Sequence, residues 1–287
     1  MRFVSYVQNG VTGVGILDDA TETVVVLSGY KGISSDMTTF IGMGQAGLDA
    51  AREVLAKPGE RVPLGDVRIL APIPRPRSAI LCVGRNYREH VKETNAANPV
   101  PEHPILFSKP PFSVVASGDV VDLHADITES VDYEGELAVV IGATTRNVAE
   151  DRAMDHVFGY TILNDVSARD LQRRHTQWVI GKGLDTFCPM GPCITHKSAM
   201  PPHDAIGLTT KVNGEIRQEG NTRDLMFDIP YLISLLSRGM TLEAGDILAT
   251  GTPKGVGAGF TPPRFLRKGD TVEIAIDGIG TLRNMFA

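Results

Sequence analysis

Residues 132–142 read DYEGELAVVIG, an apolar run that begins with two glutamates two positions apart, Glu134 and Glu136. In a β-strand, side chains at i and i+2 point to the same face, so these two carboxylates should project side by side. A second apolar run, residues 157–163, ends just before Asp165. Three carboxylates at neighbouring strand ends repel one another unless a cation offsets their charge, and an oxygen-preferring divalent metal is the simplest such cation. Ordinary edge or loop acids are the alternative, and the residues alone leave both open.

Composition and charge are those of an ordinary globular chain. Its 287 residues are 42% hydrophobic and 22% charged, and the net charge of −6 gives no support for nucleic-acid binding. No apolar stretch approaches the roughly 18–20 residues needed to span a bilayer, and the N-terminus is typical of a first strand rather than a signal peptide. Cys82, Cys188 and Cys193 lack the spacing of a disulfide framework or a zinc ribbon. We therefore expect a cytoplasmic protein with free, mostly buried thiols and with no membrane or nucleic-acid partner.

Two regions differ in their pattern of expected elements. Residues 1–72 predict a small α+β domain, with a hairpin around Asn9-Gly10 and a helix over residues 36–56. Residues 72–76, PIPRP, are stiff and extended, which is typical of a linker. Residues 77–287 contain many short strands punctuated by glycine and proline, without the strand–helix alternation of a doubly wound sheet. The expected fold class is therefore α+β, mainly β, with a roll-like or barrel-like second domain.

Local signals locate further elements in the second region. The pairs Asn213-Gly214 and Asp277-Gly278 each predict a hairpin, and residues 228–230, DIP, predict the start of a helix. Ser167-Ala168-Arg169-Asp170 fits a helix start of the capping-box type, with a hydroxyl followed by an acid three residues later. We expect a second helix to begin there.

His90 and Glu93 are three residues apart after the Gly84 turn, so they share one face of a helical turn. A carboxylate beside an imidazole orients the ring and raises its basicity, which is the arrangement that a water-activating base needs. An exposed pair on a surface helix has the same spacing, and the spacing alone favours that interpretation. The remaining histidines have no metal-ligand spacing and are expected on the surface: positions 103, 124, 156, 175, 196 and 203.

Other polar residues are candidates for contact with an anionic ligand. Lys109 ends an apolar strand and Lys182 lies between two glycines, although single lysines are usually solvated. Arg169 and Gln172 are three apart on the helix expected after Asp165, so they face the same way.

Known catalytic and nucleotide motifs are absent from the sequence. The loop TGTPKGVG at residues 250–257 lacks the order of a phosphate-binding P-loop, but a threonine hydroxyl in such a turn can still contact an anion. There is no G-x-S-x-G elbow, no H-E-x-x-H and no convincing G-x-G-x-x-G followed by a helix. Serine hydrolases, zinc proteases and dinucleotide enzymes are therefore disfavoured.

An ordered set of motifs over about residues 77–287 resembles the fumarylacetoacetate hydrolase family. The motifs are GRNY at 84–87 with His90, DYEGEL at 132–137, GY at 159–160, NDVSARDLQ at 164–172, GK at 181–182 with DTF at 185–187, VNGE at 212–215, GNT at 220–222 and TGTP at 250–253. Each motif is weak by itself, but the ordered set is specific. The resemblance implies the family's mixed β-roll catalytic domain over residues 77–287, behind a small N-terminal domain, and a homodimer.

The resemblance also implies a site. Mg²⁺ or Mn²⁺ would be held by Glu134, Glu136 and Asp165, and His90 with Glu93 maps onto the family's water-activating dyad. The positions expected to contact the substrate are Lys109, Arg169, Gln172, Lys182 and Thr252, with Tyr160 lining the pocket and Arg85 also binding the substrate.

Members of the family include C–C hydrolases of acylpyruvates, oxaloacetate decarboxylases, and hydratases and isomerases of ring-cleavage products from aromatic catabolism. The dyad favours a hydrolase acting on a ketonic substance, a 2,4-dioxo acid such as fumarylpyruvate, with release of pyruvate and a carboxylic acid. His90 would deprotonate the water, and Lys109 or Lys182 would stabilise the oxyanion. The alternatives are an oxaloacetate decarboxylase, a hydratase or isomerase, and a non-catalytic protein with a structural calcium site.

Two loops, around residues 95–104 and 173–190, are expected to set the acyl group and to close as a lid. Arg173, Arg174 and His175 in the second loop indicate an anionic distal end of the substrate, such as that of a dicarboxylate.

Overall fold

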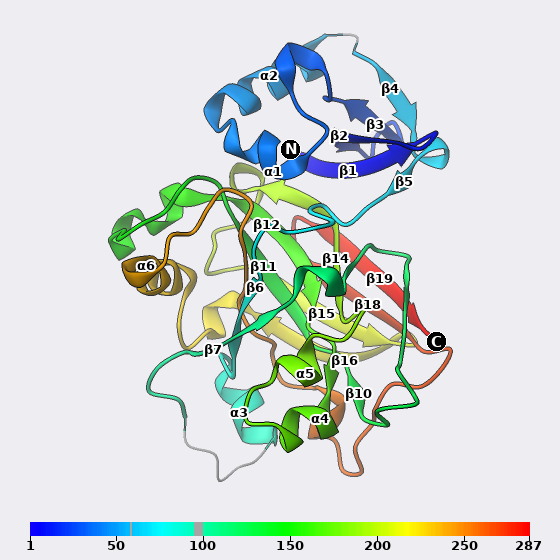
Figure 1. The fold of residues 1–287 in the computed structure, drawn as a ribbon, viewed down its shortest axis with the longest axis vertical. Helices are drawn as coiled ribbons and strands as arrows, with labels where there is room; N and C mark the ends of the chain where they lie inside the picture. The colour runs from blue at the N-terminus through cyan, green and yellow to red at the C-terminus, as the bar shows by residue number, and fades with distance from the viewer. Residues whose placement is uncertain (58, 95–99) are drawn as a thin grey trace.

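The computed structural model describes residues 1–57, 59–94 and 100–287, and it is built mainly from β-strands (Figure 1). Its larger sheet has the order β4-β3-β2-β1-β14-β12-β11-β17-β6-β7. Along this order the strands are β4 (Arg61–Pro63), β3 (Thr23–Val26), β2 (Val11–Asp18), β1 (Arg2–Gln8), β14 (Cys188–His196), β12 (Val157–Asn164), β11 (Gly135–Ile141), β17 (Ile247–Ala249), β6 (Ile80–Gly84) and β7 (Ile105–Lys109), with β5 (Arg68–Ile69) beside β1 and β8 (Val114–Val115) beside β14.

A second sheet and a two-stranded ribbon complete the β-structure. The second sheet contains, in order, β16 (Glu215–Asn221), β15 (Gly207–Val212), β18 (Thr271–Ile276), β19 (Gly280–Phe286) and β9 (Val120–Val121). The ribbon pairs β10 (Val131–Asp132) with β13 (Ser167–Ala168). The α-helices are α1 (Met37–Gly42), α2 (Gln45–Ala56), α3 (Arg88–Thr94), α4 (Arg169–Arg174), α5 (Val179–Lys182) and α6 (Ile229–Gly239). The expected α+β, mainly β fold class is therefore confirmed.

The turn signals in the sequence form as expected. Asn9-Gly10 joins β1 to β2 with φ values of 49° and 79°, and Asn213-Gly214 joins β15 to β16 with φ values of 52° and 80°. Two positive φ values are what the tight hairpin turn requires, and asparagine and glycine tolerate them. Helix α6 also begins as predicted, because the Asp228 side chain accepts a hydrogen bond from the Tyr231 N–H.

Two helix predictions were wrong in detail. Residues 36–56 form two helices, α1 and α2, because Gly44 between them adopts a left-handed φ of 56°. Ser167-Ala168 does not cap a helix, because both residues pair with β10 as strand β13. The Ser167 hydroxyl donates to the Asp165 carbonyl instead, and α4 begins at Arg169 with no side-chain cap.

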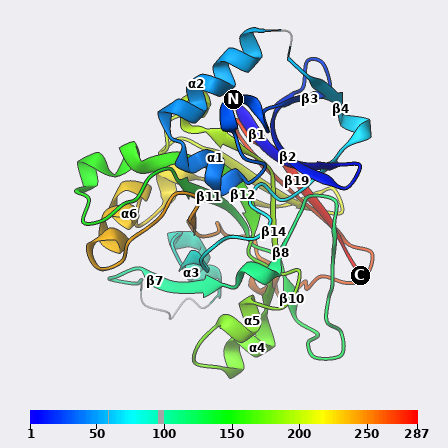
Figure 2. The same cartoon turned by 45° about the horizontal axis from the view of Figure 1, so that its top comes forward.

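The N-terminal unit extends the larger sheet of the rest of the molecule. Strand β1 pairs antiparallel with β14, with Arg2 opposite Thr195 and Phe3 opposite Ile194. The ring of Phe3 packs on Phe158 of β12 with centroids 5.5 Å apart. Figures 1 and 2 both place this unit at one end of the molecule, while α4 and α5 lie at the opposite end. Strand pairing and aromatic packing therefore join the unit to the larger sheet.

Two general expectations can be compared with the structure. All three cysteines are free and buried, as expected. Within the described part of the chain, none of the helices is both long and apolar enough to cross a membrane.

His196 lies at the junction of the two regions and is buried, contrary to the surface position expected for it. Its backbone N–H donates to the Met1 carbonyl, and its ring lies edge-on to Phe158. Its Nδ1 accepts a hydrogen bond from the Ser198 N–H. Burial lowers the pKa of His196 from its usual 6.5 to about 4, because the charged imidazolium would lose hydration.

We expect this histidine to make stability depend on pH. Between about pH 6.5 and pH 4 the unfolded chain binds the proton more readily than the folded chain, so the free energy of unfolding falls as the pH falls. His196→Asn keeps an acceptor for Ser198 and should flatten this dependence. The measurement is urea unfolding of both proteins at several pH values from 4 to 7, within the window that the pKa of about 4 sets. Equal slopes in the two proteins would show that His196 is not the responsible group.

Candidate active site

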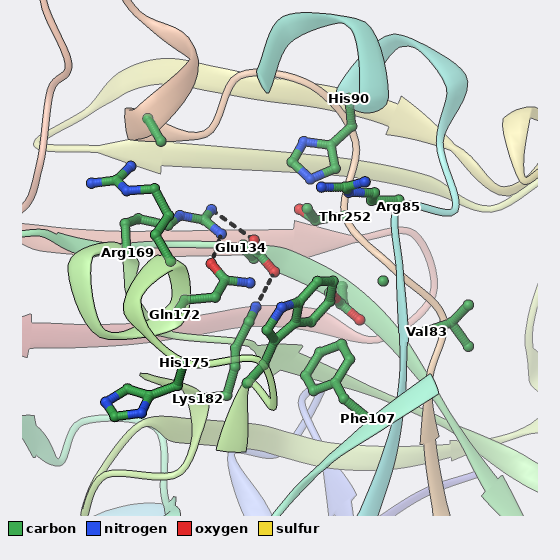
Figure 3. Close-up of a pocket in the computed structure, with 15 residues that line it drawn as sticks. Val83, Arg85, His90, Phe107, Glu134, Arg169, Gln172, His175, Lys182 and Thr252 are labelled. Atoms are coloured by element: carbon green, nitrogen blue, oxygen red, sulfur yellow. Dashed lines mark hydrogen bonds and ion pairs between the residues drawn. The ribbon is translucent and has the colours of Figure 1, made fainter. Parts of the chain in front are cut away.

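A cavity of about 460 Å³ opens where β6, α3, α4, α5 and the loop after β17 meet (Figure 3). The side chains that line it come from segments far apart in the sequence. They are Val83, Gly84, Arg85, His90, Phe107, Glu134, Glu136, Arg169, Gln172, Arg173, His175, Trp178, Lys182, Thr252 and Ala258.

Three carboxylates meet at the base of the cavity because β11 and β12 pair in a fixed register. Gly135 lies opposite Asn164, so Glu134 and Glu136 flank the position that Asp165 follows. The Asp165 N–H donates to the Glu134 carbonyl at 2.8 Å. One carboxylate oxygen from each of the three acids lies within 4.8 Å of the others, and all three residues are buried.

Buried cations offset part of this charge. Glu134 Oε2 lies 2.7 Å from Lys182 Nζ and its Oε1 lies 2.7 Å from Arg169 Nη2 (Figure 3). Lys182 Nζ also lies 2.6 Å from Asp165 Oδ2. Burial alone would raise the pKa of Glu134, but Lys182 and then Arg169 outweigh it and hold this pKa well below its usual range. Lys109 Nζ completes the set at 2.6 Å from Asp165 Oδ1.

Glu136 is the exception in this charge balance. Among the described residues no lysine or arginine forms an ion pair with it, and its Oε2 accepts the Gly251 N–H at 2.8 Å. Burial, followed by the charges of Asp165 and Glu134, raises the pKa of Glu136 well above its usual value. A cation beside this carboxylate would therefore stabilise its ionised form.

The geometry of the three acids fits a small divalent ion. Two oxygens bound to one Mg²⁺ lie at most about 4.2 Å apart, since each metal–oxygen distance is about 2.0–2.1 Å. The three carboxylate oxygens lie within 4.8 Å of one another, so the side chains need to move only slightly closer together to bind one ion. Glu134, Glu136 and Asp165 are thus the residues that would hold the metal, and the all-oxygen donor set suits Mg²⁺ or Mn²⁺.

The structure also brings His90 and Glu93 together on the cavity wall. His90 Nδ1 lies 2.8 Å from Glu93 Oε1, and the other Glu93 oxygen, Oε2, accepts the Gly255 N–H at 2.7 Å. Glu93 therefore fixes the imidazole on α3 and ties this helix to the loop after β17. Because Nδ1 is the nitrogen that Glu93 engages, Nε2 is the nitrogen that would take part in acid–base chemistry.

The other predicted site residues divide into two groups. Arg85, Arg169, Gln172, Lys182 and Thr252 line the cavity. Lys109 and Tyr160 do not belong to the lining.

The contacts of the last two residues explain their positions. Lys109 is fully buried behind Asp165, where its ammonium also donates to the Val166 carbonyl at 3.0 Å and to the Lys182 carbonyl. These contacts orient Asp165, so the structure gives Lys109 a positioning role. Tyr160 packs into the hydrophobic core on β12.

Several residues that shape the site were not predicted. Asp132 accepts hydrogen bonds from Arg169 Nε at 2.8 Å and from the backbone N–H groups of Gly257 and Ala258, so it anchors both Arg169 and a loop. The sequence signal that could have identified Asp132 is its position at the start of the DYEGEL motif. Trp178, the only tryptophan in the chain, packs edge-on against Phe107 with centroids 5.3 Å apart and forms an apolar wall.

The two loops expected to form a lid are only partly described. Residues 95–99 of the first loop lie outside the described residues. In the second loop, Arg173, His175 and Trp178 line the cavity, whereas Arg174 does not.

With this fold and site, the chain belongs to the fumarylacetoacetate hydrolase family. The family model "Fumarylacetoacetate (FAA) hydrolase C-terminal" matches residues 79–287. A second model, "Rv2993c-like, N-terminal", matches residues 1–72.

Two named relatives of the chain are oxaloacetate tautomerases. The chain is 56% identical to oxaloacetate tautomerase YisK of Bacillus subtilis over 221 residues, which cover 77% of this chain and 73% of that protein. It is 44% identical to the mitochondrial oxaloacetate tautomerase FAHD2A of Homo sapiens over 251 residues, 86% of this chain and 78% of that protein.

Solved structures share the whole fold. A fumarylacetoacetate hydrolase from psychrophilic Exiguobacterium antarcticum has a TM-score of 0.86 at 39% identity, covering 100% of this chain and 99% of that one. Maleylpyruvate hydrolase from Sphingobium sp. SYK-6, in complex with manganese(II) and pyruvate, has a TM-score of 0.82 at 30% identity with the same coverage. The chain is therefore an enzyme of this family, and a divalent metal fits both its acidic triad and the manganese-bound neighbour.

Removing the unpaired acid tests the metal site directly. Glu136→Gln should weaken Mn²⁺ binding by more than the roughly 10–100-fold that loss of a group supporting a ligand costs. Isothermal titration with Mn²⁺ measures this, and Glu129→Gln, at an exposed acid, is the matched control. Without metal, the Glu136→Gln protein should be no less stable than the wild type, because one of three repelling carboxylates is gone. Unchanged Mn²⁺ affinity would exclude Glu136 as a ligand.

Proposed function

We propose that this protein is a metal-dependent oxaloacetate tautomerase, which interconverts the keto and enol forms of the acid. The observation that carries the proposal is one cavity that contains both a carboxylate-oriented imidazole, His90 with Glu93, and the triad of acids suited to a divalent metal. Enolisation beside a carbonyl needs a base and a group that polarises the carbonyl. Similarity to two oxaloacetate tautomerases, at 56% and 44% identity, supports the choice of substrate.

Each residue of the cavity has a part in this reaction. Glu134, Glu136 and Asp165 would hold a metal that supplies Lewis-acid chemistry to the 2-oxo group. His90 Nε2 takes a proton from C3 of oxaloacetate, and the imidazolium returns it to the 2-oxo oxygen, so the keto and enol forms contain the same atoms. Glu93 stabilises the imidazolium during the transfer.

Two further groups position the substrate. The Lys182 ammonium, at the base of the cavity, donates to the oxygen on which negative charge develops. Trp178 and Phe107 exclude water from one wall, which strengthens these polar contacts.

Hydrolysis of an acylpyruvate is the second candidate. The same dyad can deprotonate a water molecule that attacks the C4 carbonyl of a 2,4-dioxo acid, releasing pyruvate and a carboxylic acid. Similarity to maleylpyruvate hydrolase favours this reaction. Decarboxylation of oxaloacetate would need the metal but no activated water, so it would give His90 and Glu93 no catalytic role.

One assay distinguishes the three reactions. Protein loaded with Mn²⁺ or Mg²⁺ is mixed with oxaloacetate in a weak, non-coordinating buffer, and the ultraviolet absorbance of the enol is followed while coupled lactate dehydrogenase reports pyruvate. A tautomerase accelerates the change in enol absorbance without forming pyruvate, whereas a decarboxylase forms pyruvate. Fumarylpyruvate and acetylpyruvate, each in a separate cuvette without oxaloacetate, test hydrolysis by the same pyruvate readout.

His90→Gln should lower the rate of tautomerisation by about 10²–10⁴-fold, the usual contribution of a general base. His203→Gln, outside the cavity lining, is the control and should keep the wild-type rate. A His90→Gln protein with the wild-type rate would remove this residue from the mechanism. Pyruvate from an acylpyruvate without tautomerisation of oxaloacetate would replace the proposal by the hydrolase.

A further inference from the structure

Helix α4 presents a row of polar side chains to the cavity. Arg169, Gln172 and Arg173 line the cavity, whereas Arg174 on the same helix does not. Residues three and four apart lie on one face of a helix, so Arg169 and Arg173 are stacked one turn apart while Arg174 points elsewhere.

The two stacked arginines differ in their surroundings. Arg169 is buried and paired with Asp132 and Glu134, whose oxygens lie 2.8 Å and 2.7 Å away. Arg173 is exposed, and it forms no hydrogen bond or ion pair with any side chain in the described part of the chain. A guanidinium beside a cavity and without a carboxylate partner is free to pair with a carboxylate of a ligand.

The cavity as a whole carries more positive than negative side chains. Arg85, Arg169, Arg173 and Lys182 line it, together with Glu134 and Glu136. Arg169 is paired with Asp132 and Glu134, and Lys182 with Glu134 and Asp165, so Arg85 and Arg173 are the lining cations that have no acidic partner among the described residues. A bound divalent metal would add to this excess. The charge therefore favours a ligand with more than one carboxylate.

The helix sets the spacing between the two ends of such a ligand. Four residues of α-helix rise about 6 Å, so Arg173 lies about one turn from Arg169 and from the metal end of the cavity. It also lies on the solvent side, since Arg169 is buried and Arg173 exposed. A 2-oxo dicarboxylate anchored at the triad by its 2-oxo acid end would direct its second carboxylate toward this solvent side.

We propose that Arg173 binds the second carboxylate of the substrate and makes the site selective for 2-oxo dicarboxylates over 2-oxo monocarboxylates. The assignment rests on the proposed function, because it needs a 2-oxo acid anchored at the acidic triad. It holds for tautomerisation and for hydrolysis alike.

Arg85 is the competing residue. It follows β6 in a left-handed backbone conformation with φ of 57°, and Figure 3 shows it beside His90 and Thr252, on the dyad side of Glu134. That position suits contact near the reacting carbon rather than with the far end of the substrate. Arg173 comes from a different element, helix α4, which also carries Arg169 and Gln172.

The test uses two unreactive ligands of nearly equal shape. N-oxalylglycine and N-ethyloxamate both carry the oxalyl group that chelates a metal, but the first ends in a carboxylate and the second in a methyl group. Isothermal titration of the Mn²⁺-loaded protein gives the preference for the dicarboxylate as a ratio of dissociation constants. The variants are Arg173→Gln, Arg174→Gln as the control on the same helix, and Arg85→Gln as the competitor.

Arg173→Gln should lower the preference for N-oxalylglycine by about 10–100-fold, as expected for loss of a charge-assisted pair, and should leave the affinity for N-ethyloxamate unchanged. Arg174→Gln should keep the wild-type ratio. The KM of Arg173→Gln for oxaloacetate should rise more than its kcat falls, since the contact lies away from the reacting atoms.

Other outcomes would reject either the role of Arg173 or the proposed tautomerase reaction, and the two can be told apart. If Arg85→Gln loses the preference and Arg173→Gln keeps it, or if Arg173→Gln and Arg174→Gln behave alike, the assignment of Arg173 is wrong. A wild-type protein that tautomerises oxaloacetate without preferring the dicarboxylate would reject Arg173 and keep the reaction. A protein that prefers the dicarboxylate through Arg173 but does not tautomerise oxaloacetate would keep Arg173 and reject the reaction.

Discussion

The active site is built around three buried carboxylates that meet at the base of the cavity. The antiparallel register of β11 and β12 brings Glu134, Glu136 and Asp165 within reach of a single ion, and their mutual repulsion has to be offset. Buried cations compensate two of the acids, and Glu136 is left for a metal. Buried ion pairs add little net stability, so we interpret the cluster as a device for binding metal and substrate that the surrounding core supports.

The loop after β17 links the separate parts of the site. Its backbone N–H groups donate to three acids with different roles: Gly251 to Glu136 at 2.8 Å, Gly255 to Glu93 at 2.7 Å, and Gly257 to Asp132 at 2.7 Å. Successive backbone donors of this kind suit anionic groups. The loop therefore sets the metal ligand, the partner of the base and the anchor of Arg169 relative to one another.

Much of the fold could be predicted because its signals are local. The Asn-Gly turns need only the φ preferences of two residues, and Glu134 and Glu136 need only the two-residue repeat of an extended chain. Long-range contacts decided the rest. Pairing with β10 turned Ser167-Ala168 from a helix cap into a strand, and packing against Phe107 placed Trp178 in the cavity wall. The sequence also offered no reason to prefer Arg173 over Arg174 as a ligand contact. The orientation of α4 decides it, because Arg173 lines the cavity and Arg174 does not.

The pairing of β1 with β14 has a consequence for the order in which the chain assembles. β1 (Arg2–Gln8) is synthesised well before its partner strand, β14 (Cys188–His196). Until then β1 can form only its local hairpin with β2 and the following strands, so the N-terminal unit must wait as a sheet with one open edge. The edge of β14, in contrast, finds β1 already present when that strand appears. Once the two strands pair, each edge is shielded from pairing with a foreign strand, so the N-terminal unit covers an edge of the larger sheet that would otherwise be open there.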